Sequence, residues 1–212
     1  MNANSHSEAV WQLLHQAQAV LVDDGFAEPS PPLPGVASGG ESFLNTEGYA
    51  DVATRYGEHL DFGAKWPAGM GSSTPLALVF TGAPLTEGAT AFVRSWFENP
   101  RVNLTLAAHF FVQPFPAFSG EKPPYQELAR DLCALFKPKA LLSLGPVPAQ
   151  RLLGAPLSLD TLRGTDYRFD RWSMVTTFDP ELFLALAEEE KNRFKGQIWK
   201  DLQRLLGKLR YG

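Results

Sequence analysis

Cysteine is almost absent from this 212-residue sequence, which has Cys133 alone. A single thiol excludes an intrachain disulfide and any metal cluster held by several cysteines of this chain, and a small core residue is the expected role. The four histidines are not spaced as metal ligands, and neither a Gly-x-Ser-x-Gly turn nor a phosphate-binding loop ending in Lys-Ser or Lys-Thr occurs. We therefore expect no cofactor, and neither a metalloenzyme nor a nucleotide hydrolase.

Long hydrophobic runs are also missing, since no apolar stretch approaches the roughly 20 residues that cross a bilayer. The N-terminal residues have neither the basic start nor the apolar core of a signal peptide. These absences predict a cytoplasmic protein without a membrane contact. The length suits one α/β domain with a sizeable core.

The formal net charge of −4 conceals a basic C-terminal region, because Lys191 to Gly212 carries seven basic residues and Asp201 as its single acid. A negative overall field opposes general binding to nucleic acid, whereas a local basic face can still meet a phosphate backbone. We predict a weak DNA contact through the 191–210 helix, with the solvated face of a helix as the simpler alternative.

The N-terminal region reads as a helix on a tether. Ser5 and Glu8 form a capping-box pattern, and apolar residues then recur at helical spacing. A Pro-, Gly- and Ser-rich stretch follows, so we divide the chain into an arm, residues 1–41, and a domain, residues 42–212. Trp11 and Leu14 are candidate anchors for a protein partner, because aromatic residues dominate small interfaces. The alternative is that Trp11 packs on its own domain.

An alternation of strands and helices begins at Pro75. Apolar runs predict strands at Leu76 to Thr81, Leu104 to Val112, Lys139 to Leu144, Tyr167 to Phe169 and Trp172 to Phe178. Helical spacing predicts helices at Tyr49 to Tyr56, Ala89 to Phe97, Tyr125 to Phe136 and from Pro180 onward, with Leu157 to Leu162 as a connector. This order predicts an α/β fold of three α/β/α layers around a mostly parallel sheet.

The stretch Pro138 to Gly154 reads as a buried strand, a tight turn and a helix. Pro146 and Pro148 suit the first helical turn, and Gly154 suits the C-cap. The stretch resembles the corresponding segment of the uracil-DNA glycosylase superfamily, most closely its iron–sulphur branch. The resemblance spans about Pro75 to Leu209 and implies a uracil-DNA glycosylase-like fold.

Two loops of that family lack their expected chemistry in this chain. The family's first strand ends in a loop whose acid or amide positions water, but Gly82, Ala83 and Pro84 keep only the outline of this loop. After the next strand the family's asparagine reads uracil, and a cysteine holds the cluster. His109 and Phe110 stand at that place, so the resemblance implies no iron–sulphur cluster. A neutral His109 imidazole offers one donor and one acceptor to a base, or it is satisfied by the backbone.

The third family motif, His-Pro-x-x-Leu-Leu, is matched by the segment Asp179 to Leu184. The family's histidine stabilises the departing uracil anion, whereas an ionised Asp179 would repel it. Leu182 to Leu184 suit either an apolar wedge or packing against the sheet. The resemblance thus implies degenerate catalytic positions at Ala83, His109 and Asp179. It implies a substrate-binding edge of Gly82, Pro84, His109, Phe110, Asp179 and Phe183.

A further resemblance is to the psi subunits of bacterial clamp loaders, which look like members of this superfamily without catalytic residues. It rests on Leu76 to Thr86 and on Asp179 to Leu182 ahead of a charged helix. The sequence therefore predicts a non-catalytic interaction subunit of DNA replication or repair. The alternatives are a divergent glycosylase in which Asp179, His109 or Glu87 has a new role, and a nucleotide-sensing module.

Overall fold

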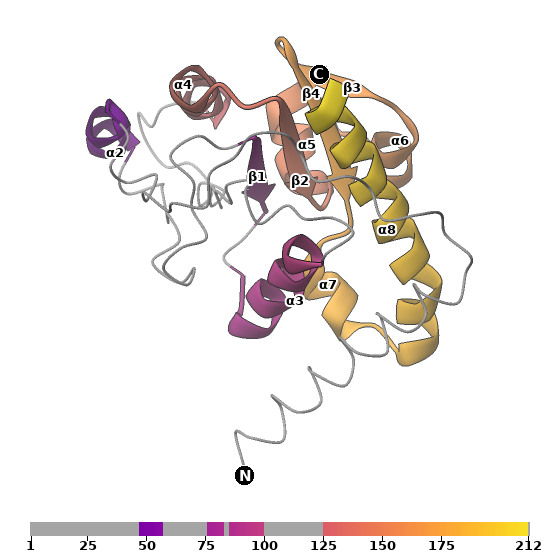
Figure 1. Ribbon diagram of the computed structural model, residues 1–212. Coiled ribbons are helices and arrows are strands. Elements are labelled where there is room, and N and C mark those ends of the chain that lie inside the picture. Colours follow the sequence, from indigo (N-terminus) through magenta and orange to yellow (C-terminus); the bar gives the residue numbers. More distant parts are fainter. Residues whose placement is uncertain (1–46, 57–75, 83–84, 100–124, 212) are drawn as a thin grey trace.

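A short, mostly parallel sheet organises the part of the chain that the computed structural model describes, residues 47–56, 76–82, 85–99 and 125–211 (Figure 1). Its strands are β1 (Ala77–Thr81), β2 (Ala140–Leu144), β3 (Tyr167–Phe169) and β4 (Trp172–Thr177), in the order β1-β2-β4-β3. β1, β2 and β4 are parallel, and β3 joins β4 as an antiparallel hairpin. The predicted α/β class and the mostly parallel sheet are confirmed.

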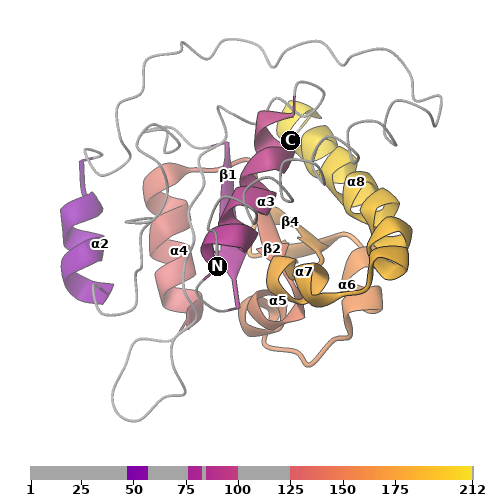
Figure 2. The same ribbon diagram turned by 90° about the horizontal axis from the view of Figure 1, so that it is seen from below.

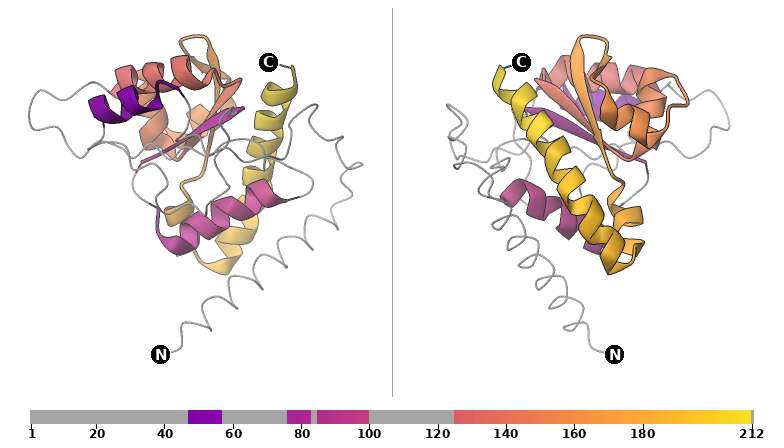
Figure 3. Two further views of the ribbon diagram at one scale, coloured as in Figure 1. Left: turned by 60° about the vertical axis from the view of Figure 1, so that its left-hand side comes forward. Right: turned by 90° about the vertical axis from the view of Figure 1, so that its right-hand side faces the viewer.

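The helices lie on both faces of this sheet (Figure 3). One face is covered by α2 (Tyr49–Tyr56), α4 (Tyr125–Phe136), α5 (Pro146–Leu153) and α6 (Leu159–Gly164). The other face is covered by α3 (Glu87–Glu98), α7 (Pro180–Ala185) and α8 (Glu188–Tyr211). Two separate hydrophobic clusters result, because successive strand residues point to opposite faces.

The central strand β2 shows why these residues form a sheet. All five of its residues are buried, and alternate side chains enter the two clusters, with Leu141 in one and Leu142 in the other. Burying a leucine fully contributes about 1.5–3 kcal/mol, so both faces stabilise this strand. The expectation of a strand covered on both sides is confirmed.

The central strand–turn–helix unit also forms as predicted. Pro146 occupies the first turn of α5, and Gly154 ends the helix in the left-handed conformation with φ of 66°. Its backbone N–H donates to the carbonyl of Gln150, as expected of a glycine C-cap. α2 and α4 have the bounds that the sequence predicted. Cys133 on α4 is fully buried, as expected for a core residue.

One sequence interpretation needs correction. The segment Leu157 to Leu162 is more than a short connector, because Ser158 caps a helix by accepting from the amide of Thr161. The helical region predicted from Pro180 onward is confirmed, and it consists of two helices, since Leu186 adopts an extended conformation and ends α7. The three glutamates that follow then begin α8, where the helix dipole favours negative charge.

Several predictions concern residues outside the described part of the chain. The first concerns the arm of residues 1–41 with Trp11 and Leu14, and the second concerns the strand Leu104 to Val112 with His109 and Phe110. Ala83 and Pro84 also lie outside it.

None of the described helices combines the length and the apolar character that a bilayer-spanning segment requires.

Candidate functional site

The site predicted by resemblance lies at the carboxyl edge of the parallel strands, where β1, β2 and β4 lead into α3, α5 and α7 (Figure 2). Of the predicted site residues, the structure describes Gly82, Asp179 and Phe183. Gly82 follows β1, Asp179 follows β4 by two residues, and Phe183 lies inside α7. Parallel strands bring the first two to the same edge of the sheet.

Gly145 allows the chain after β2 to pass close to Asp179. Its φ is 88°, and a Cβ built there would lie 3.0 Å from the Cβ of Asp179. Its amide donates to the carbonyl of Thr177 at 2.9 Å, and its own carbonyl accepts from the Ser143 hydroxyl at 2.9 Å. The chain after β2 is therefore joined to the end of β4 at this edge.

A similar close approach occurs beside β1. A Cβ at Gly82 would lie 3.2 Å from the Cβ of Val147 in the first turn of α5. The two glycines thus let neighbouring loops pack on each other. Gly82 and Gly145 both serve packing at this edge.

Asp179 is held as a helix cap. Its Oδ1 accepts from the amide of Glu181 at 2.9 Å and from the amide of Leu182 at 3.4 Å, which satisfies the first donors of α7. Pro180 occupies the first turn, where its missing N–H costs nothing. This geometry explains an aspartate at this position without invoking catalysis.

The neighbouring acid, Glu181, links α7 to α3. Its two carboxylate oxygens accept from the amide and the hydroxyl of Thr86, the latter at 3.1 Å. Thr86 is in turn the N-cap of α3 and accepts from the amide of Ala89. Glu87 directly follows Thr86 and is exposed in the first turn of α3. A negative charge in that turn is favoured by the helix dipole.

Phe183 belongs to the core. It is 2% exposed, and its ring stacks on Phe92 of α3 with centroids 4.8 Å apart and planes 4° from parallel. Its neighbour Leu182 is 67% exposed. The Phe183 ring is fixed between α3 and α7 and therefore cannot contact a bound base, whereas the exposed Leu182 side chain can.

Two hydroxyls near the edge are buried without a hydrogen-bond partner in the described structure, those of Thr81 and Thr176. Thr176 lies opposite Ser143 of β2 and Thr81 opposite Leu144, so the hydroxyls lie on opposite faces of the sheet. They do not converge on one pocket.

No protein-family model matches this chain, and no curated protein does.

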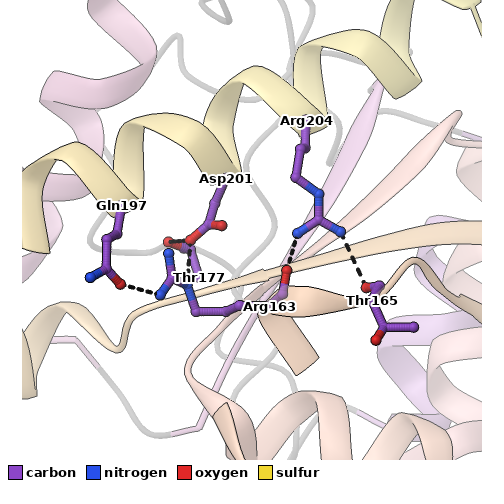
Figure 4. Close-up of polar contacts among 6 residues, drawn as sticks. All are labelled: Arg163, Thr165, Thr177, Gln197, Asp201 and Arg204. Atoms are coloured by element: carbon purple, nitrogen blue, oxygen red, sulfur yellow. Dashed lines mark hydrogen bonds and ion pairs between the residues drawn. The ribbon is translucent and has the colours of Figure 1, made fainter. Parts of the chain in front are cut away.

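A second polar cluster, which sequence reasoning missed, lies where α6, β4 and α8 meet (Figure 4). Asp201 on α8 is 3% exposed, and its Oδ2 accepts from Arg163 Nε at 2.7 Å and from the Thr177 hydroxyl at 2.9 Å. Arg163 also donates to Gln197, and its guanidinium lies 4.4 Å from the ring centroid of Phe178. These contacts connect α6 and β4 to α8, so the buried pair fastens α8 to the sheet.

The cluster continues toward the surface through Arg204. Its guanidinium donates to the carbonyls of Arg163 and Thr165, the latter at 3.2 Å, and to Asp166 at 2.8 Å. Lys208 binds the other oxygen of Asp166 at 2.6 Å. Two of the seven basic residues counted in the C-terminal region are therefore occupied by one acid.

The pKa values of the two aspartates in this cluster shift in opposite directions, for different reasons. Desolvation raises the pKa of Asp201, and the ion pair with Arg163 opposes that rise. Hydrogen bonds from Lys208 and Arg204 lower the pKa of the exposed Asp166. Burial also raises the pKa of the Cys133 thiol, which leaves it protonated and unreactive. Within residues 47–56, 76–82, 85–99 and 125–211, no group of three His, Cys, Asp or Glu could hold a metal.

Proposed function

We propose that this protein is a non-catalytic member of the uracil-DNA glycosylase-like, three-layer α/β proteins and acts as an interaction subunit in DNA replication or repair, in the manner of psi. The observation that carries the proposal is the role of Asp179. It occupies the place of the family's anion-stabilising histidine, and its Oδ1 is bound by two backbone amides of α7. An ionised carboxylate only accepts hydrogen bonds and would repel a departing base anion.

The rest of the described edge supports the same conclusion. Glu181 is bound to Thr86, Phe183 is stacked in the core, and Gly145 closes the gap between β2 and β4. Base release requires a group that reads the base and a group that activates water. The described side chains of Asp179 and Glu181 instead have local structural tasks.

The parallel order β1-β2-β4 with helices on both faces supports the three-layer scaffold. The central strand–turn–helix unit, which carries the resemblance, forms at the residues expected of it.

The test is a single-turnover assay with the full-length protein in excess over DNA carrying uracil, hypoxanthine or xanthine, in single- and double-stranded form. We expect no base release. Asp179→Asn is the matched variant, because asparagine caps a helix about as well as aspartate and leaves the fold unchanged. Base release by the wild type that is lost in Asp179→Asn, at unchanged melting temperature, would establish a divergent glycosylase and overturn the proposal.

The interaction role is tested separately with the double variant Trp11→Ala and Leu14→Ala in the full chain. Wild-type protein immobilised on beads is expected to capture a replication or repair complex, and the double variant to lose it, because aromatic anchors carry a large share of interface energy. Capture that is equal for both proteins would contradict the predicted partner contact of the arm.

A further inference from the structure

The exposed surface of α7 is apolar, which is unusual for a helix at the surface of a protein. Leu182 is 67% exposed, and Ala185, three residues later on the same side of the helix, is exposed as well. Surface helices normally turn charged or polar residues toward water. The one charged side chain of α7, Glu181, is instead bound to Thr86 of α3. We name Leu182 and Ala185 the α7 face.

Exposed apolar side chains gather at the carboxyl edge of the sheet. Among the large apolar residues that the structure describes, only Leu182 and Val147, the latter at 40%, are exposed. Val147 is in the first turn of α5, whose N-cap Gly145 packs closely on Asp179, the N-cap of α7. Both side chains therefore follow the carboxyl ends of neighbouring strands. Apolar side chains that gather in this way, rather than scatter singly, indicate an interaction site.

The α7 face belongs to a helix that is anchored on several sides. Asp179 caps the helix, Glu181 ties its first turn to Thr86, and Phe183 stacks against α3. A partner that docks on an element already held in place loses less conformational entropy on binding. Leu182 is therefore presented as a ready apolar anchor.

The helix starts around the α7 face are acidic. Glu87 is exposed in the first turn of α3, which the bonds of Glu181 attach to α7. The first turn of α8 follows α7 after two residues and exposes Glu188, Glu189 and Glu190. Figures 1 and 3 show α3, α7 and the start of α8 together, at the end of the molecule away from the β3–β4 hairpin.

The described bases do not cancel this charge. Lys191 is the single base in the first turns of α3, α7 and α8, and it binds Glu188 at 3.0 Å. Within the described structure Glu87, Glu189 and Glu190 have no ion pair. The next cations lie further along the helices, Arg94 on α3 and Arg193 and Lys195 on α8, where Lys195 donates to Asn192. The α7 face is thus an apolar surface with an acidic border.

We infer that the α7 face docks a basic, amphipathic segment of a protein partner. The apolar side chains of that segment would cover Leu182, and its lysines or arginines would meet Glu87, Glu189 and Glu190. Charge complementarity of this kind speeds association and fixes the register of the docked segment. The inference rests on the proposed interaction role, and it adds a contact on the α/β domain to the one predicted for the arm.

The same acids argue against other occupants of the α7 face. They repel the phosphates of DNA, so insertion of Leu182 to Leu184 into a duplex as a wedge is disfavoured. They repel a membrane of anionic lipids for the same reason. A symmetric contact between two copies of this chain would use the same surface twice and place like charges face to face. A partner with cations beside its apolar residues is the occupant that satisfies both features.

The experiment is a fluorescence-anisotropy titration of a labelled amphipathic peptide with the full-length protein. The probe has about 18 residues, five helical turns, with leucines at helical spacing and lysines elsewhere. The control peptide has glutamate in place of each lysine.

Two variants of the protein separate the apolar contact from the charges, and each has a matched control. Leu182→Ser tests the apolar contact, with Ala134→Ser as its control, because Ala134 is exposed on α4 across the sheet. Glu189→Lys with Glu190→Lys tests the charges. Its control is Glu47→Lys with Glu127→Lys, which changes two exposed glutamates elsewhere and alters the net charge equally.

We expect the leucine–lysine peptide to bind the wild type, and Leu182→Ser to weaken that binding at least about tenfold. The pair Glu189→Lys and Glu190→Lys should weaken binding about fivefold or more at about 50 mM salt and much less at about 500 mM, because salt screens exposed charges. Both controls should stay within about twofold of the wild type. If Leu182→Ser lowers the melting temperature, Leu182→Ala, a better helix former, is expected to show the same direction of change.

Several results would overturn the inference. They are absence of binding to the wild type, equal binding of the leucine–glutamate peptide, and equal losses in a test variant and its control. Sedimentation of the wild type as a dimer that Leu182→Ser dissociates would assign the face to a second copy. Competition by phosphatidylserine vesicles would assign it to a membrane. The cleavage and arm-capture experiments use neither this peptide nor these variants, so failure here is distinguishable from failure of the proposed function.

Discussion

The buried cluster around Asp201 and the carboxyl edge around Asp179 use similar groups in different surroundings. Each aspartate lies near the carboxyl end of β4 and accepts two close hydrogen bonds. Asp201 is 3% exposed and its partners are an arginine and a threonine, whereas Asp179 is half-buried and its partners are backbone amides. The first holds two distant segments together, and the second begins a helix. Each aspartate thus has a structural role within the described fold.

The largest loss of stability should come from removing the buried carboxylate of Asp201. Asp201→Ala leaves the Arg163 guanidinium, whose side chain is 12% exposed, without its counter-charge. Removing one partner of a buried pair costs about 3–5 kcal/mol, so urea denaturation should show a loss of this size. The control Asp166→Ala removes an aspartate that also has two cationic partners but is 57% exposed, and it should cost less than about 1 kcal/mol.

The double variant Arg163→Met with Asp201→Leu sharpens this result. Well-packed apolar residues often replace a buried ion pair without loss, so most of the lost stability should return. Equal costs for Asp201→Ala and Asp166→Ala would show that burial does not distinguish the two regions.

At the carboxyl edge, we expect Gly145→Ala to cause a smaller loss of stability. The φ of 88° is unfavourable for any residue with a Cβ, and the new methyl would lie 3.0 Å from Asp179 Cβ. Backbone strain of this kind costs about 1–3 kcal/mol, measurable by thermal or urea unfolding. Gly207→Ala is the control, because a Cβ there meets nothing within 4 Å and alanine favours the helix by roughly 0.5–1 kcal/mol. A neutral Gly145→Ala would contradict the close packing between β2 and β4.

Local signals in the sequence account for most of the fold that could be predicted. Apolar periodicity predicts the bounds of α4, and prolines with a terminal glycine predict α5, because these signals act within a few residues. The missed helix α6 also has a local signal, Ser158 followed by Asp160 in the first turn. Its apolar pattern is too short to distinguish a helix from a connector.

The roles of the site residues are harder to predict, for physical reasons. Asp179 followed by Pro180 is a readable N-cap signal, whereas the resemblance points to catalysis instead. The pair Arg163 and Asp201 is separated by 38 residues and forms only when β4 brings α6 and α8 together. No periodicity or spacing in the sequence indicates such a contact, so the buried cluster could be identified only from the structure.

The smallest effect is a difference in how pH changes the contributions of Asp201 and Asp166 to stability. Because the pKa of Asp201 is raised in the folded state, the unfolded chain releases the Asp201 proton at a lower pH than the folded protein does. Its contribution should therefore fall as pH rises above the usual aspartate value of about 4. The pKa of Asp166 is lowered, so the contribution of Asp166 should fall as pH drops below about 4. Urea midpoints across this range for the wild type, Asp201→Asn and Asp166→Asn should show slopes changed in opposite directions. Of the two pH dependences, only the one that comes from Asp166 should weaken in about 1 M salt, because salt screens exposed charges far more than buried ones. Slopes changed in the same direction would contradict the opposite environments of the two carboxylates.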